Sequence, residues 1–308
     1  MLRWGELASY APSGAVVSTR FPGLWYAEAL TEIPAHPSTL GPVSLANMQV
    51  DVTTRLGAAT KPIATGFAGI DNLLGGGLRP GTVLALTGGP GSGRTSLALM
   101  MAYMAARASA GVVFATRGVD ETEVVARLAA RAVRRVYPES EVTYGDILAG
   151  GVTANDTVRR AVSDAVDTVI HKVGAHLHLA RFGAGDTLAL LIERSTQLWA
   201  RYERAVLLVD DIEGIAVSEP GELAARIAET AYALRQVADQ GCAVVLTALE
   251  CHAELVAPAA TMLVGVTPGE SNGGGAVPLT LNIRKNRVGG IGRITVQARF
   301  AASEFSEG

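Results

Sequence analysis

Aromatic residues and cysteines are scarce in this sequence of 308 residues. Phe, Trp and Tyr together make up 5% of it, and the cysteines are Cys242 and Cys251. Two cysteines are too few for a disulfide-stapled scaffold, so we expect both to be reduced, as is usual in a cytoplasmic protein. The apolar fraction of 49% must come mainly from Ala, Val, Leu and Ile. Such a core favours parallel strands with helices on both faces.

An excess of positive charge and long apolar runs are also missing. The formal net charge is −3, and lysine occurs only at positions 61, 172 and 285, so nearly all basic residues are arginines. The chain as a whole therefore has no basic surplus for nucleic acid, although a local basic channel stays open as an alternative. No apolar run approaches the ~20 residues that a membrane-spanning helix needs, so we expect no membrane partner.

Residues 1–60 differ from the rest of the chain. They hold five of the 13 prolines and two of the three tryptophans, and they show no clear amphipathic period. This pattern predicts an irregular N-terminal arm, followed by one ordered domain over residues 61–308. Apolar residues on such an arm would dock either on a neighbouring subunit or on their own domain.

From residue 65 onward, short apolar or β-branched runs alternate with longer helical stretches. This alternation predicts an α/β fold with a mostly parallel central sheet. The predicted strands cover residues 82–87, 111–116, 205–211, 243–247, 278–283 and 292–300. The predicted helices cover residues 121–135, 153–171, 187–201 and 222–240.

A glycine-rich segment lies between the first predicted strand and a helical stretch. It matches the phosphate-loop pattern G-x-x-x-x-G-K-[ST] at every fixed position except one, where Arg94 replaces the lysine. Glycines lack a Cβ, so successive N–H groups can surround a phosphate, and the following helix adds its positive dipole end. The alternative is a glycine-rich turn that binds nothing. The predicted nucleotide ligands are Gly88, Gly89, Pro90, Gly91, Ser92, Gly93, Arg94, Thr95 and Ser96.

Two acids and one hydroxyl are candidates for holding Mg²⁺. Thr95 is the hydroxyl residue that the phosphate-loop pattern places on the metal. Asp210 closes an apolar strand further along the chain, where phosphate-loop enzymes carry a metal-binding aspartate, and Asp211 could share that role. The alternative is that a strand-end acid caps the next turn.

The order of these segments resembles the RecA-fold ATPase core of the DnaB-like replicative helicases. The resemblance extends from about Thr65 to Phe305. RecA, RadA and KaiC-like ATPases share the fold and the lead-in but match the last stretch less well. Four stretches carry the resemblance: the glycine-rich lead-in at 65–81, the phosphate loop, the strand at 206–211, and Lys285-Asn286-Arg287-Val288-Gly289-Gly290-Ile291-Gly292.

The resemblance implies that ATP and Mg²⁺ are the cofactors and that the chain assembles with itself. In that family, a K-x-R-x-G-x-x-G segment reaches into the nucleotide site of the neighbouring subunit. By this match, Lys285 and Arg287 would contact the γ-phosphate held by the next subunit, and a guanidinium suits phosphate oxygens. A trans-acting pair implies a homo-hexamer or a filament. The alternative is a solvated basic hairpin.

The catalytic residues depart from the family pattern. Arg94 keeps the charge of the lysine but is longer and planar, so we expect binding to survive and hydrolysis to slow by a factor of about ten or more. The family places a catalytic Glu after the second strand, where this chain has Arg117 or Gly118. Asp120 or Glu121 could substitute as the base.

The loops that line the DNA channel in the helicases carry no Lys or Arg here between residues 211 and 226 or over 267–278. Because strand tracking depends on cations, single-stranded DNA is a weakly supported partner. The family also places a polar residue at the end of the fourth core strand. In this chain the corresponding position is Ala248 or Leu249, both of which are apolar. The leading hypothesis is an ATP-binding ring protein with slow or regulatory hydrolysis. The alternatives are an active hexameric helicase and a nucleotide-gated scaffold.

Overall fold

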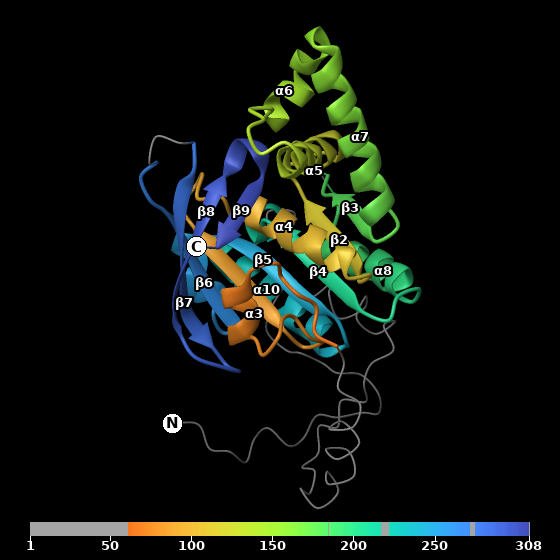
Figure 1. Cartoon of the computed structure of the whole chain (residues 1–308). Helices are drawn as coiled ribbons and strands as arrows, with labels where there is room; N and C mark the ends of the chain where they lie inside the picture. The colour runs from red at the N-terminus through yellow and green to blue at the C-terminus, as the bar shows by residue number, and fades with distance from the viewer. Residues whose placement is uncertain (1–60, 184, 217–221, 272–274, 308) are drawn as a thin grey trace, which may run out of the picture.

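A nine-stranded sheet runs through the part of the chain that the computed structural model describes, residues 61–183, 185–216, 222–271 and 275–307 (Figure 1). Its strand order is β3-β2-β4-β5-β1-β6-β7-β8-β9. The six strands from β3 to β6 are parallel, and β7, β8 and β9 continue the sheet in antiparallel order. The prediction of an α/β fold with a mostly parallel sheet is confirmed. The predicted arm lies outside the described residues.

The strands have the following bounds: β1 Val83–Gly88, β2 Gly111–Thr116, β3 Leu177–Arg181, β4 Ala205–Asp210, β5 Ala243–Leu249, β6 Met262–Pro268, β7 Val277–Asn286, β8 Gly292–Arg299 and β9 Glu304–Glu307. Every residue of β1 and β2 is buried, because helices cover both faces of the sheet. The sequence prediction did not include β3, β6 or β9. Two of these, β3 and β9, are edge strands of four or five residues, too short for a clear alternation.

The helices are α3 Ala68–Leu73, α4 Arg94–Arg107, α5 Glu121–Val136, α6 Tyr144–Leu148, α7 Asp156–Val173, α8 Leu188–Trp199, α9 Ile212–Ala216, α10 Leu223–Asp239 and α11 Ala253–Val256. The described residues also form the 3-10 turns η2 Gly151–Ala154, η3 Glu250–His252 and η4 Phe300–Ala302. Helix α7 begins three residues later than predicted. The Asn155 side chain accepts hydrogen bonds from the backbone N–H groups of Thr157 and Val158 and so caps the helix there.

Two apolar clusters lie on opposite faces of the sheet. One contains α4 together with residues of α3, α5 and α7, and the other contains α8, α9 and α10. In Figure 1, α7 and α5 lie side by side above α4, and a third, smaller cluster joins α5 to α7. Helix α4 is therefore enclosed between the sheet and a second layer of helices. Within the described residues, no helix combines the length and apolar character needed to cross a membrane.

The carboxyl ends of the parallel strands meet at one edge of the sheet. Strand β5 lies between β1 and β4, so the segment after β1 and Asp210 at the end of β4 are two strands apart. Thr116 at the end of β2 pairs in register with Asp210. Open α/β sheets bind ligands in the crevice outside this edge, which directs attention to these loops.

Candidate functional site

The glycine loop joins β1 directly to α4, as the sequence predicted. Gly91 and Gly93 have φ values of 73° and 89°, in the left-handed region that favours glycine. A Cβ on Gly88 would lie 2.5 Å from the Ser92 Oγ and 2.7 Å from the Val266 carbonyl oxygen. The tight path of this loop therefore requires glycine at these positions.

The start of α4 has the properties of an anion site. Its N-cap residue, Gly93, has no side chain to bond the first N–H groups of this 14-residue helix. The Ser92 hydroxyl and the Arg94 Nη1 are buried and have no hydrogen-bond partner within the described residues. Buried donors without partners are costly unless a ligand satisfies them. The residues present therefore fit a bound phosphate group.

Thr95 and Asp210 lie together, although 115 residues separate them. The Thr95 hydroxyl donates to the Asp210 Oδ1 at 3.2 Å, and the Thr247 hydroxyl donates to the same oxygen at 2.7 Å. Burial raises the pKa of the Asp210 carboxyl, while the bonds from Thr247 and Thr95 and the charge of Arg94 oppose that shift. A cation beside this carboxyl would favour its charged form.

Thr247 is a site residue that sequence reasoning missed. It lies on β5, the strand between β1 and β4, and it is buried. A single hydroxyl in the otherwise apolar run of residues 243–249 was the available signal. Asp211 has a different environment, because its Oδ1 accepts a hydrogen bond from the Gly214 backbone N–H at 2.7 Å. That bond favours the capping alternative for Asp211.

The predicted bases occupy the start of α5. The Asp120 carboxylate accepts from the Glu123 backbone N–H at 2.8 Å and so caps this helix. Glu121 lies 3.9 Å from Arg181, and both side chains are more than half exposed. Arg117 packs against Gly214, with 3.5 Å between its Cβ and the position of a glycine Cβ. The structure thus places a cation, not a carboxylate, directly after β2.

A cavity of about 600 Å³ adjoins the glycine loop. Arg127 of α5 donates to the Ser96 hydroxyl at 3.2 Å and to the Tyr144 hydroxyl at 3.3 Å, and its guanidinium carbon lies 4.1 Å from the Tyr144 ring centroid. Phe300 also lines the cavity, and a Cβ on Gly93 would lie 2.3 Å from its ring. Sequence reasoning missed Arg127, Tyr144 and Phe300, and no local pattern marked them. This cavity has the size and aromatic lining of a small-ligand site.

Lys285 and Arg287 lie at the end of the sheet opposite the glycine loop, where the parallel strand β6 begins. Their neighbour Asn286 pairs with Met262, the first residue of β6, whereas the glycine loop leaves the carboxyl end of the adjacent parallel strand β1. The six residues of β1 span roughly 20 Å. Lys285 and Arg287 therefore do not reach the glycine loop of their own chain.

The two cations contact backbone carbonyls within the chain. The Lys285 ammonium donates to the Ala257 carbonyl oxygen, and the Arg287 guanidinium donates to the Pro258 carbonyl oxygen at 2.8 Å. Burial lowers the pKa of Lys285, and the charges of Arg287 and Arg235 lower it further.

Arg284 was also missed as a site residue. It lies at an irregularity in the β6–β7 pairing, and its guanidinium donates to the Thr87 hydroxyl and to both oxygens of Glu250, the latter at 2.6 and 3.1 Å. Thr87 directly precedes the glycine loop. Arg284 is thus the cation of the C-terminal segment that approaches the loop within one chain.

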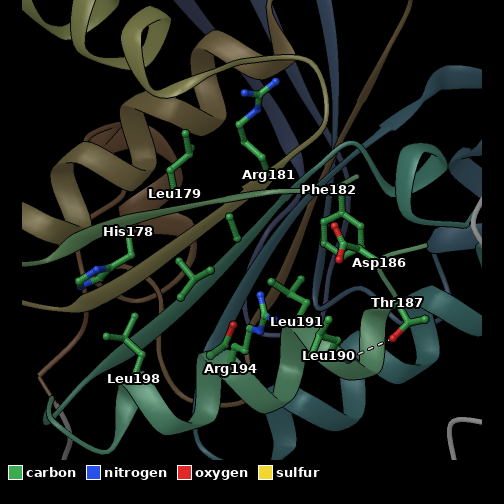
Figure 2. Close-up of a pocket in the computed structure, with 13 residues that line it drawn as sticks. His178, Leu179, Arg181, Phe182, Asp186, Thr187, Leu190, Leu191, Arg194 and Leu198 are labelled. Atoms are coloured by element: carbon green, nitrogen blue, oxygen red, sulfur yellow. Dashed lines mark hydrogen bonds between the residues drawn. The ribbon is translucent and has the colours of Figure 1, made fainter. Parts of the chain in front are cut away.

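A second cavity, of about 310 Å³, lies between the edge strand β3 and helix α8. Figure 2 shows the residues that line it, from β3 on one side and from α8 on the other. The lining is largely apolar and includes Leu179, Phe182 and Leu191. It contains none of the predicted site residues.

The strand order and the loop together define the class. A glycine loop after β1, an aspartate at the end of β4 and one strand between them form a RecA-type phosphate-loop fold. The DnaB-like helicase C terminal domain model matches residues 62–254, more than half of the chain. The chain belongs to this family.

Relatives and solved structures agree with this assignment. The chain is 29% identical over 164 residues to the DNA repair and recombination protein RadB of two strains of Halobacterium salinarum, covering 49% of this chain and 67% of RadB. The structure is also similar to a DnaB-like replicative helicase solved with its interactions with primase, with a TM-score of 0.69, 16% identity, and coverage of 91% and 70% of the two chains. A second solved structure, of an ATPase domain, gives the same TM-score and identity, with coverage of 87% and 99%. At this identity, the two structures support the fold alone.

Proposed function

We propose that this chain binds ATP with Mg²⁺, hydrolyses it slowly, and acts in DNA replication or recombination as a ring or filament. The observation that carries the proposal is the hydrogen bond between Thr95 and Asp210 beside a loop with two buried, unpartnered polar atoms. When bound, ATP supplies the phosphoanhydride bond, and Mg²⁺ neutralises its phosphate charge. The relatives named RadB and the DnaB-like helicases support the pathway.

Different residues of the chain would bind the phosphates, the metal and the nucleoside. Backbone N–H groups of the glycine loop, Ser92 and Arg94 would donate to phosphate oxygens, and Thr95 and Asp210 would hold the metal. Thr247 fixes the orientation of the Asp210 carboxylate. The cavity between Phe300 and Tyr144 would take the nucleoside part of the ligand.

Slow hydrolysis follows from the loop after β2. General base catalysis contributes about 10²–10⁴-fold in rate, and no carboxylate directly follows β2 within the described residues. Asp120 is engaged as a helix cap. The test is an ATP-binding titration beside a phosphate-release assay on the wild-type chain and on Asp210→Asn. We expect tight binding with slow release, and loss of both Mg²⁺ dependence and release in the variant. Rapid release by the wild type would contradict slow turnover.

Self-assembly would complete the site. Because Lys285 and Arg287 lie at the edge of the sheet opposite the glycine loop, they would act on a nucleotide held by the next subunit. Sedimentation with and without ATP and Mg²⁺ tests this part, and an unchanged profile would contradict nucleotide-dependent assembly. Stimulation of phosphate release by single-stranded DNA would favour the active-helicase alternative. Assembly without any phosphate release would favour the scaffold alternative.

A further inference from the structure

A third cavity, of about 360 Å³ and lined by basic side chains, lies at the far end of α4 from the glycine loop. It is enclosed by α4, α5 and α7, which pack together in Figure 1. Its lining includes Tyr103, Arg107, Arg131, Arg135, Tyr137 and Lys172.

Among the described residues, the positive charge of this cavity is only partly balanced. Four cations line it, Arg107, Arg131, Arg135 and Lys172, against one carboxylate, Asp164. Within the described residues, none of the four cations forms an ion pair. Two other arginines of α5 do form them: Arg127 lies 2.7 Å from Glu123, and Arg134 lies 2.8 Å from Glu304. The arginines that face the cavity therefore form a distinct set, in which positive charges outnumber the carboxylate of Asp164.

The guanidinium groups are held close to one another despite their repulsion. The guanidinium carbons of Arg107 and Arg131 lie 5.9 and 5.2 Å from the centroid of the same ring, Tyr103. The Arg131 Nε is buried and has no hydrogen-bond partner among the described residues. Burial lowers the pKa of Arg131, and the charges of Arg135 and Arg107 add to that effect, while Tyr103 and Glu304 oppose it. An anion in the cavity would relieve both the repulsion and the missing bond.

This cavity is separate from the nucleotide site. Helix α4 begins at Arg94 in the glycine loop and ends at Arg107, and its 14 residues span roughly 20 Å. The residues that line the two cavities do not overlap. A ligand here is therefore additional to ATP in the glycine loop.

The lining indicates which anion fits. Three planar guanidiniums present paired N–H donors that match phosphate oxygens. A net surplus of three positive charges exceeds what one carboxylate would neutralise. Tyr137, which also lines the cavity, is 54% exposed and offers an aromatic face on which a base can stack. A cavity of this volume takes a ligand of about nucleotide size.

We propose that this cavity binds the phosphate and base of a single nucleotide unit. The unit is supplied either by a free mononucleotide or by a single strand of nucleic acid, whose phosphate chemistry is the same. The two sources are distinguished by the probes of the experiment.

The experiment measures binding of two fluorescent probes, an adenosine monophosphate analogue and a single-stranded oligonucleotide of about ten nucleotides. It uses the full chain with Arg94→Ala and Thr95→Ala, which remove two ligands of the glycine loop. Arg107→Gln with Arg135→Gln should weaken binding about 100-fold, since each lost charge-assisted bond costs roughly tenfold. The control pair, Arg201→Gln with Arg293→Gln, removes the same charge from exposed positions outside the cavity and should change affinity by less than about twofold.

The outcomes separate the sources and can overturn the proposal. Cavity-dependent binding of the monophosphate identifies a free nucleotide, and cavity-dependent binding of the oligonucleotide alone identifies a strand. Equal losses of affinity in the cavity pair and in the control pair, or no loss in either, would overturn the proposal that the probes bind in this cavity. Displacement by polyglutamate as effective as by nucleotide would overturn the assignment to phosphate. If circular dichroism shows that the Arg107→Gln, Arg135→Gln variant is unfolded, the substitution Lys172→Gln at an exposed position replaces it as the test. We then expect the affinity for the probe to fall about tenfold.

Discussion

Replacing Thr247 with Val tests the structural account of the buried acid. The substitution removes the hydroxyl that donates to the Asp210 Oδ1 at 2.7 Å and keeps nearly the same volume. Asp210 is 7% exposed, so water does not readily replace the lost donor. A hydrogen bond to a charged group contributes about 1.5–3 kcal/mol, and we expect a destabilisation of that size when Asp210 is ionised.

The destabilisation caused by Thr247→Val depends on pH, and its direction follows from the pKa of Asp210. Burial already raises the pKa of Asp210, and the Thr247 hydroxyl opposes this, so Thr247→Val raises the pKa further. A carboxyl with a raised pKa in the folded state binds its proton more tightly there than in the unfolded chain. Its contribution to stability is present below the unfolded pKa of about 4 and is lost as the pH rises through the folded pKa. The variant therefore loses most stability at neutral pH and only about 1 kcal/mol near pH 4, where the lost bond is between neutral groups.

The assay is urea unfolding at about pH 7.5 and about pH 4 without Mg²⁺. Thr116→Val is a matched control, because Thr116 is equally buried, lies on β2 beside the Asp210 strand β4, and its hydroxyl accepts from the neutral backbone N–H of Gly118 at 3.3 Å. The control should lose the same stability at both pH values. Equal losses for Thr247→Val at the two pH values would refute the claim that Asp210 is ionised and held by Thr247.

Three further predictions concern the glycine loop and its neighbours. Gly93→Ala should abolish ATP binding in a titration and destabilise the fold by at least 1–2 kcal/mol, because φ is 89° and the new Cβ would lie 2.3 Å from the Phe300 ring. Arg94→Lys combined with Gly118→Glu should raise phosphate release about 100-fold or more without tightening ATP binding, since it restores a base to the loop after β2; no gain would locate the defect elsewhere. Arg287→Ala should leave ATP binding intact but reduce release at protein concentrations that support assembly, and an effect independent of protein concentration would exclude action on a neighbouring subunit.

The glycine loop, the parallel sheet and the Asp210 strand could be predicted from the sequence because each depends on a local pattern. Glycine spacing and apolar runs are read directly from neighbouring residues, and the β1–loop–α4 unit is a single local motif. Thr247, Arg127 and Phe300 could not be found in that way. They reach the site through strand order and helix packing, which bring together residues from β5, α5 and the C-terminal segment.

The acids differ in their side-chain environment, which the sequence pattern does not show. Asp120, Asp211 and Asp210 each stand at the end of a strand or the start of a helix in the sequence. The first two accept backbone N–H bonds at 2.8 and 2.7 Å, whereas Asp210 accepts hydroxyls from two other elements. Backbone capping is available to any acid at such a position. A convergence of two threonines on one buried carboxylate requires the folded sheet.

The features of the proposed site fall into two groups, one for nucleotide binding and one for hydrolysis. In the proposed function, the loop, Thr95 and Asp210 would bind the nucleotide in its ground state, and these residues lie together within one chain. Turnover would need in addition a base after β2, where Arg117 and Gly118 lie, and, under the same proposal, cations from another subunit. Loss of the ground-state group would abolish binding, whereas loss of the second group slows only chemistry. If Lys285 and Arg287 act on a neighbouring subunit as proposed, this chain would respond to nucleotide mainly through its assembly.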